Sequence, residues 1–258
     1  MPLYDDWCEN DAQKEGKKSL WKLTERSKGR AKIVARLAET VRAHYDSLER
    51  IAEDVEELGY EGAAAILRER LPRSKTARSG DLGEILASEL VQERLGFNVP
   101  VRRMRYKDGR EVALRGDDFI GVGYDEDDKL WLLKGESKSR TALAKGTITT
   151  ARKALNRDNG RCTPHSLLFI ADRLLDQGGE MEELGREMRK EVGAKALPRS
   201  RIDHVLFTLS GNAPPSALTD DYSALNQDRK QTVINFRIED HQTFIAEIYD
   251  EASSLGDD

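Results

Sequence analysis

The chain has 258 residues, of which 38% are hydrophobic and 34% charged, and its formal net charge is −5. No apolar run approaches the roughly 20 residues that span a bilayer, and the N-terminal residues lack the basic and apolar regions of a signal peptide. Two distant cysteines, Cys8 and Cys162, exclude a disulfide framework and a cysteine-rich zinc site. We therefore expect a cytoplasmic protein with no membrane segment.

The charge is distributed unevenly along the chain. Residues 116–128 carry six acidic and no basic side chains. On one side, residues 66–115 carry 12 basic against 7 acidic side chains, and on the other, residues 129–162 carry 9 against 2. An acidic segment between two basic ones suits a site that holds cations while its surroundings attract phosphate. Ordinary variation of surface charge is the alternative.

The first predicted region is helical and covers residues 1–75. Residues 1–28 are polar, and we expect them to be irregular. Apolar residues at alternating steps of three and four predict a helix over 30–58, with Gly59 as its stop, and a second helix follows at about 61–70. The two helices would form a hairpin.

The second region, residues 76–175, has the pattern of a helix, three strands, a helix and a strand. The expected elements lie at about 82–95, 99–106, 112–124, 130–138, 141–157 and 166–171. Asp108-Gly109 is typical of a hairpin turn between the first two strands. The segment before the first helix, Pro72–Gly80, is a predicted basic linker.

The third region, residues 176–258, would add an α/β extension that completes the same domain. We expect a helix at 179–192, a strand at 202–209, a long loop over 211–224, a strand at 232–238 and a final helix capped by Asp240. The whole chain is therefore predicted to be α/β.

Glu136 and Lys138 follow the apolar strand Leu-Trp-Leu-Leu at 130–133. Residues two apart on a strand point to the same face, so both side chains would lie together, with Ser137 opposite. Asp118 ends the polar part of the preceding strand, and antiparallel pairing would bring it to the same end of the sheet. Two such carboxylates repel each other unless a hard cation lies between them.

These residues are the parts of a site for metal-assisted phosphodiester hydrolysis. Mg²⁺ (or Mn²⁺) takes one or two protein carboxylates plus substrate oxygens, so we expect Asp118 and Glu136 as metal ligands. Lys138 would orient or deprotonate the attacking water and counter the charge that develops on phosphorus. Glu84, on the preceding helix, would complete the metal shell. The alternatives are a structural ion-pair triad and, for Glu84, an acid favoured by the helix dipole.

Basic side chains crowd the predicted hairpin, and one more lies on the helix expected after the site. Arg102, Arg103, Arg105, Lys107 and Lys145 are our candidates for binding nucleic-acid phosphates, which position a strand without reading its sequence. Solvated surface charge is the competing interpretation. No helix-turn-helix or zinc-finger pattern is present, so we expect little sequence specificity.

The motifs resemble those of the PD-(D/E)xK nuclease superfamily over about residues 82–172. Gly-Asp-Asp at 116–118 and Glu-Ser-Lys at 136–138 match its motif, and Gly83-Glu84 matches its helix acid. The proline that usually precedes the first acid is absent, and Arg115-Gly116 stands there. The acidic doublet leaves two candidates for the first ligand. Asp118 fits the family's spacing better than Asp117, which would be a surface charge or would support the ligands.

Within that superfamily, the full layout resembles the HamA family, the nuclease subunits of the Hachiman antiphage system. This resemblance implies Mg²⁺-dependent DNA cleavage and a helicase partner, HamB. Two other functions remain open from the residues alone. One is a catalytically silent nuclease-fold module that binds DNA or a partner protein, and the other is a stand-alone restriction-type endonuclease.

Overall fold

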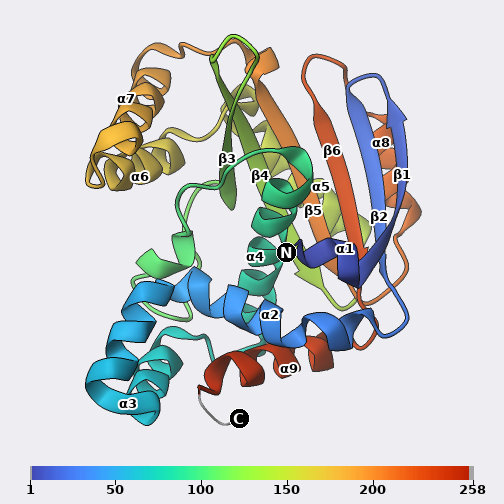
Figure 1. Cartoon of the computed structure of the whole chain (residues 1–258). Coiled ribbons are helices and arrows are strands. Elements are labelled where there is room, and N and C mark those ends of the chain that lie inside the picture. The colour runs from blue at the N-terminus through green and yellow to red at the C-terminus, as the bar shows by residue number, and fades with distance from the viewer. Residues whose placement is uncertain (1, 256–258) are drawn as a thin grey trace.

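The computed structural model describes residues 2–255, and within them six strands form one mixed sheet (Figure 1). The strand order is β1-β2-β6-β5-β4-β3. The strands are β1 (Cys8–Glu15), β2 (Lys18–Glu25), β3 (Phe119–Tyr124), β4 (Leu130–Arg140), β5 (Ile202–Ser210) and β6 (Gln231–Arg237). The four central strands run parallel, and both edge strands, β1 and β3, are antiparallel to their neighbours. The expected α/β class is confirmed.

Helices cover both faces of the sheet (Figure 1). They are α1 (Leu3–Trp7), α2 (Gly29–Tyr45), α3 (Leu48–Arg70), α4 (Lys75–Leu95), α5 (Lys145–Asn156), α6 (Pro164–Leu175), α7 (Gly179–Ala194), α8 (Ser216–Ser223) and α9 (His241–Ser253). Short 3₁₀ turns lie at Arg103–Tyr106, Arg157–Gly160 and Arg199–Arg201. Among the described residues, no helix combines the length and apolarity that crossing a bilayer requires.

The central strands are buried on both faces because each face has its own helical cover. Phe207 of β5 and Phe236 of β6 pack with the apolar stripes of α2, α4 and α9. Leu206 of β5 and Val233 of β6 point to the other face of the sheet and pack with α5 and α8. A further cluster joins α6 and α7 to β3 and β4. The site described below lies on the β3–β4 edge.

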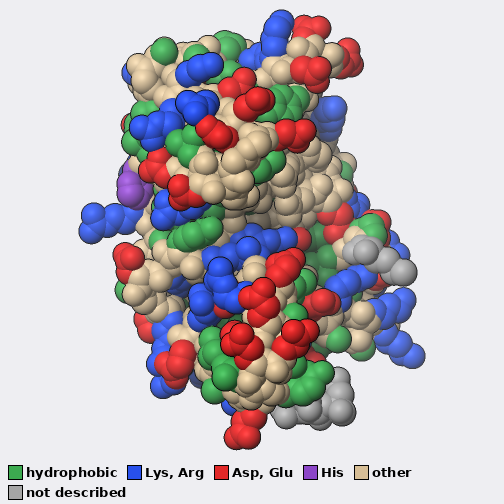
Figure 2. Space-filling model, turned by 60° about the vertical axis from the view of Figure 1, so that its left-hand side comes forward, with side chains coloured by type: hydrophobic (Ala, Val, Ile, Leu, Met, Phe, Trp, Pro, Cys, Tyr) green, Lys and Arg blue, Asp and Glu red, His purple; other side chains and the backbone are tan. Residues whose placement is uncertain are grey.

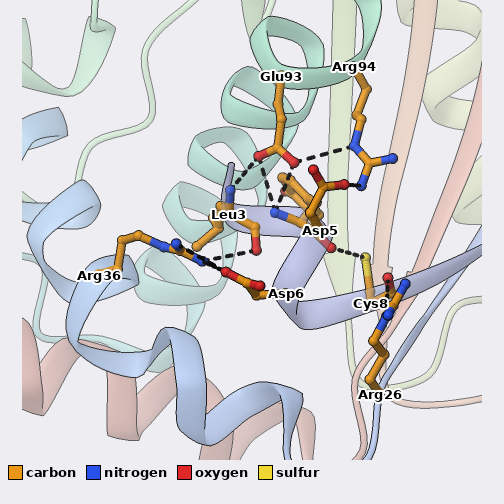
Figure 3. Close-up of polar contacts among 9 residues, drawn as sticks. Leu3, Asp5, Asp6, Cys8, Arg26, Arg36, Glu93 and Arg94 are labelled. Carbon is orange, nitrogen blue, oxygen red and sulfur yellow. Dashed lines mark hydrogen bonds and ion pairs between the residues drawn. The ribbon is translucent and has the colours of Figure 1, made fainter. Parts of the chain in front are cut away.

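The expectation that residues 1–28 are irregular was wrong. Tyr4 and Trp7 are buried, and β1 and β2 extend the sheet at its far edge. Figure 3 shows how the N-terminal turn is held: the Glu93 carboxylate of α4 accepts hydrogen bonds from the main-chain nitrogens of Leu3 (2.6 Å) and Tyr4 (3.0 Å). The carboxylate thereby satisfies main-chain donors that a helix start leaves free.

The single helix expected over 30–58 is divided. α2 ends at Tyr45, and α3 begins at Leu48 with the Ser47 hydroxyl accepting from the Arg50 nitrogen at 3.1 Å. Gly59, expected as a stop, has φ 72° inside α3 and makes a kink there. The predicted stripe over 82–95 is confirmed, but α4 begins at Lys75, so most of the expected linker is helical.

Two strands expected in the middle region were also wrong. Residues 99–106 form a loop and a 3₁₀ turn, and Asn98, just before them, forms an isolated bridge to Val122 of β3, so the hairpin at Asp108-Gly109 does not form. The apolar run 166–171 is the buried face of α6, which starts with Thr163 as cap and Pro164 in the first turn. Two strands, not three, therefore separate α4 from α5.

The C-terminal expectations were largely confirmed. α7, β5, β6 and α9 lie where their patterns place them, and Asp240 precedes α9, although its side chain makes no capping hydrogen bond. α8 interrupts the expected loop over 211–224. The division of the chain at residues 75 and 175 stays a prediction.

Candidate active site

Asp118, Glu136 and Lys138 lie together at the edge of the sheet, as their spacing predicted. Phe119 of β3 pairs with Gly135 of β4, so the next residues in this antiparallel register, Asp118 and Glu136, are opposite each other. Lys138 Nζ is 2.5 Å from Glu136 Oε1 and 3.7 Å from Asp118 Oδ2. We call these three residues and Glu84 the edge cluster.

The main chain of β4 fixes the Asp118 carboxylate. The Ser137 nitrogen donates to Asp118 Oδ2 at 2.7 Å. β4 continues to Arg140, whereas β3 begins only at Phe119, so this nitrogen has no partner from β3 and the aspartate takes it. The result is one carboxylate held by the backbone and another, Glu136, held by the Lys138 ammonium.

Glu84 reaches the cluster because α4 packs closely on β4. A Cβ added at Gly83 would be only 3.0 Å from Ser137 Oγ and 3.1 Å from Ser139 Cβ, so glycine permits this approach. Glu84 and Asp118 line the same cavity of about 10 Å³, which has room for about one water. Within residues 2–255, the Glu84 carboxylate has no hydrogen bond or ion pair, so its oxygens are available to a ligand.

The cluster carries more negative charge than its own cation balances. Burial, followed by repulsion from Asp118, raises the pKa of Glu84 well above its ordinary value and that of Glu136 to about 7. Burial also raises the pKa of Asp118, although Lys138 opposes this. Burial lowers the pKa of Lys138, but the Asp118 and Glu136 carboxylates outweigh it and raise the pKa overall, so the ammonium stays charged.

These donors fit a hard divalent cation. Among residues 2–255, no group of three or more His, Cys, Asp or Glu side chains is arranged as a ready-made metal cage. Mg²⁺ does not require one, because it commonly uses one or two carboxylates with water and substrate oxygens. Asp118 and Glu136 supply two carboxylates, and the unpartnered Glu84 adds a third oxygen donor beside Asp118.

The structure separates the two residues of the acidic doublet. Asp117 Oδ2 accepts from the Thr163 nitrogen at 2.6 Å, and Asp117 Oδ1 is 3.4 Å from Lys134 Nζ. Both side chains of that pair are only 1% exposed. Asp118, with 17% of its side chain exposed, is the one that faces Lys138. The preference for Asp118 as the site residue therefore agrees with the geometry.

The predicted phosphate-binding residues are mostly engaged within the protein. Arg103 is buried, and its guanidinium donates to the main-chain oxygens of Arg115 (2.7 Å), Asp117 and Asp118 (2.8 Å). It therefore holds the segment that carries the site. Since the hairpin that was expected to present these cations does not form, the sequence interpretation of Arg103 as a surface contact does not fit the structure.

Three more of these cations also have internal partners. Lys107 Nζ bonds the buried Asp81 at 2.7 Å, Arg102 bonds Glu89 at 2.8 Å, and Arg105 donates to the main-chain oxygen of Ala43 at 2.7 Å. Figure 2 shows Lys and Arg side chains grouped across the middle of one face, with Asp and Glu among and below them. Lys145 is exposed at the start of α5.

Two basic residues near the site, Lys134 and Arg157, were not predicted from the sequence. Lys134, inside an apolar run, donates from its buried ammonium to the main-chain oxygens of Arg157 (3.1 Å) and Arg161 (2.8 Å). Arg157 begins a turn in which Asp158, Asn159 and Gly160 all have positive φ, and its charge opposes the raised pKa of Glu136. Asp-Asn-Gly is typical of left-handed turns and was the one available signal.

Comparisons with known proteins agree with the layout of motifs. The model of the HamA family matches residues 1–252. A curated protein of Bacillus cereus, "Hachiman protein HamA", is 29% identical over 183 residues, which are 71% of this chain. The match spans 64% of the length of that relative.

Proposed function

Because this chain belongs to the HamA family, we propose that it is a metal-dependent DNA nuclease of an antiphage defence system. In this proposal it is the effector of a complex with a helicase partner, as the resemblance to Hachiman proteins implies. Its core would be a variant of the PD-(D/E)xK arrangement with two strands, not three, between the helix that carries Glu84 and the helix after the site.

One observation carries the catalytic part of the proposal. Two carboxylates, Asp118 before β3 and Glu136 on β4, lie within 3.7 Å of the Lys138 ammonium at the edge of the sheet. A structural triad would be expected to balance its charges, whereas burial raises the pKa of Glu84, Asp118 and Glu136, and repulsion from Asp118 adds to the rise for Glu84 and Glu136. Carboxylates held in this state support a site that takes up a cation.

The side chains divide the work of phosphodiester hydrolysis. Asp118 and Glu136, with Glu84, would hold Mg²⁺ or Mn²⁺, which supplies an activated water and neutralises charge on the phosphate. Lys138 Nζ, kept protonated by the acids around it, would donate to a phosphoryl oxygen as negative charge develops. The Ser137 nitrogen fixes the direction of Asp118 throughout.

A plasmid-degradation assay tests this proposal. We expect cleavage by the wild type with Mg²⁺ or Mn²⁺, alone or with the helicase partner, and a loss of at least about 10²- to 10³-fold in the Glu136→Ala, Lys138→Ala double variant. The chain offers a matched control, Glu15→Ala with Lys17→Ala, since Glu15 and Lys17 have the same spacing at the exposed β1–β2 turn. The control should cleave normally. If wild type and site variant behave alike, the catalytic assignment is wrong.

A second candidate is a silent nuclease-fold module that binds DNA or a partner protein. The short contact between Lys138 and Glu136 and the lack of a ready-made three-ligand metal group among residues 2–255 favour it. Salt-sensitive DNA binding that is independent of divalent ions, without any cleavage, would support this candidate.

A further inference from the structure

A separate polar pocket of about 260 Å³ lies where α4 begins and β4 ends. Its walls come from three elements that are distant in sequence: the first turn of α4, the end of β4 with the residue after it, and the first turn of α9. The side chains at its mouth and walls are Lys75, Thr76, Ser139, Arg140, Thr141 and Gln242. We call it the strand-end pocket.

The chemistry of this lining suits an anion. Lys75 and Arg140 are exposed, and neither forms an ion pair with any residue in the range 2–255. Among residues 2–255, the one hydrogen bond that the Arg140 guanidinium donates is to the main-chain oxygen of Ser139, at 2.7 Å. The other lining groups are hydroxyls and an amide, with no carboxylate among them. The cations expected from sequence at 102–107 have internal partners, whereas these two remain available.

The start of α4 already has a carboxylate partner. The Ser74 hydroxyl accepts from the Ala77 nitrogen at 3.2 Å and donates to Glu111 Oε2 at 2.5 Å. The positive charge of the pocket therefore comes from Lys75 and Arg140 and not from the helix terminus.

Two lining residues of the pocket, Ser79 and Ser139, belong to a network of buried, mutually bonded side chains. Ser79 of α4 and Ser139 of β4 are joined at 2.8 Å between their hydroxyl oxygens, and Ser139 Oγ is 2.9 Å from His241 Nε2 of α9. All three residues are buried. A connected polar network of this kind fixes the relative positions of the three walls.

One lining residue of the pocket connects it to the edge cluster. Arg140 is two residues beyond Lys138 on β4, about 7 Å along the strand and on the same face, whereas Ser139 lies on the face that packs against α4. β4, β5 and β6 run parallel, and ligands of open α/β sheets bind outside the carboxyl ends of such strands. We infer that the strand-end pocket binds one backbone phosphate of a nucleic-acid strand while the next phosphate of the same strand lies at the edge cluster. This inference rests on the proposed function and supplies its substrate contact.

DNA binding measured in EDTA separates this contact from cleavage. The probes are fluorescein-labelled 20-nucleotide DNA, single-stranded and duplex, followed by fluorescence anisotropy over a salt series. The Lys75→Ala, Arg140→Ala double variant should bind about 10-fold more weakly. The slope of log affinity against log salt should fall by about 1 to 2. A Lys75→Arg, Arg140→Lys variant should keep wild-type binding, because the charges remain.

A matched control removes two cations from the opposite edge of the sheet. Lys14→Ala with Lys17→Ala lowers the net charge by the same amount, and both residues are exposed at β1 and its turn. This control should leave affinity and slope unchanged. Equal losses in the two double variants would mean that only net charge matters, and would overturn the pocket. Normal binding by the Lys75, Arg140 variant would also overturn it.

Two further arms identify the ligand and the dependence on catalysis. Inorganic phosphate, a mononucleotide and an unlabelled oligonucleotide are compared as competitors of the labelled DNA. If either small anion displaces the DNA as well as the oligonucleotide does, the pocket is a site for small anions and the assignment to a nucleic-acid strand is refuted. The same binding series in the Glu136→Ala, Lys138→Ala background should give the same dependence on Lys75 and Arg140. If binding depends on Lys75 and Arg140 but the wild type never cleaves DNA, the nuclease proposal is refuted and the pocket proposal stands. If the wild type cleaves DNA but binding does not depend on Lys75 and Arg140, the pocket proposal is refuted and the nuclease proposal stands.

Discussion

Two acid–lysine pairs lie side by side on the same segments and have opposite characters. Asp117 with Lys134 is sealed in the interior, where each side chain is 1% exposed. Asp118 is the residue after Asp117, and Lys138 is four residues after Lys134 on β4. Their side chains are 17% and 21% exposed. The same residue types therefore serve two roles, and burial separates them.

The partners of each pair explain the difference. The Lys134 ammonium and the Asp117 carboxylate are surrounded by main-chain groups of the segment 157–163, which donate to the acid and accept from the base. The edge cluster has three acids for one lysine, and Glu84 has no partner within residues 2–255. A buried pair held by main-chain partners supports the fold, whereas an accessible pair with excess charge can take up a ligand.

Replacing each lysine by methionine is the strongest test of this comparison. Lys134→Met leaves the Asp117 carboxylate buried without its counter-charge, so we expect a loss of about 3–5 kcal/mol in the free energy of unfolding. Lys138→Met removes a charge that is 21% exposed, and Glu136, whose pKa is about 7, can take up a proton in response, so this variant should lose less stability than Lys134→Met. Urea unfolding of both variants measures the contrast. Equal costs would show that the two pairs do not differ as argued.

His204 gives the buried pair a pH-dependent neighbour. It pairs with Lys134 across β4 and β5, and its Nε2 is 2.8 Å from the main-chain oxygen of Gly160. Burial, assisted by the charges of Arg229, Arg152 and Lys134, lowers the pKa of His204 to about 3. The folded protein therefore keeps this imidazole neutral over a range in which the unfolded chain protonates it.

The sign follows from the lowered pKa. As the pH falls below the ordinary value of about 6.5, only the unfolded chain gains the proton, so His204 should reduce the free energy of unfolding by about 3 kcal/mol between pH 6.5 and 4. His204→Gln keeps a donor for Gly160 and should remove that share of the acid dependence. Urea unfolding at half-unit steps of pH measures it. Parallel pH curves for variant and wild type would contradict the assignment.

The site was easier to predict than the scaffold around it. Two-residue alternation on an apolar strand is enough to place Glu136 and Lys138 on one face, and the acidic turn before β4 brings Asp118 back beside them. These are local relations. The pairing of Asp117 with Lys134 is different, because nothing within an apolar run indicates that its lysine will be buried against a distant loop.

The errors in the fold have related physical causes. Of the eight residues of β1 only Cys8 is buried, so the strand is held by main-chain pairing with β2 and shows no apolar alternation. The apolar run 166–171 is compatible with a buried strand or a buried helix, and the Thr163 cap with Pro164 decided for the helix. Residues 99–106 are rich in strand-forming valine, but Pro100 removes a donor, and the Arg103 guanidinium organises the loop instead.

Glu84 provides the mildest test of the edge cluster. Burial and the nearby Asp118 disfavour its charge more than Arg103 and Lys107 favour it, and within the described part of the chain its carboxylate forms no ion pair. Glu84→Gln should therefore stabilise the protein by about 1 kcal/mol at pH 8 without a divalent ion, while DNA cleavage falls. Glu69→Gln, at an exposed acid of α3 with two arginine partners, is the matched control and should not stabilise. If Glu84→Gln loses stability instead, the carboxylate stabilises the fold, because removing an acid kept for ligand binding should relieve repulsion.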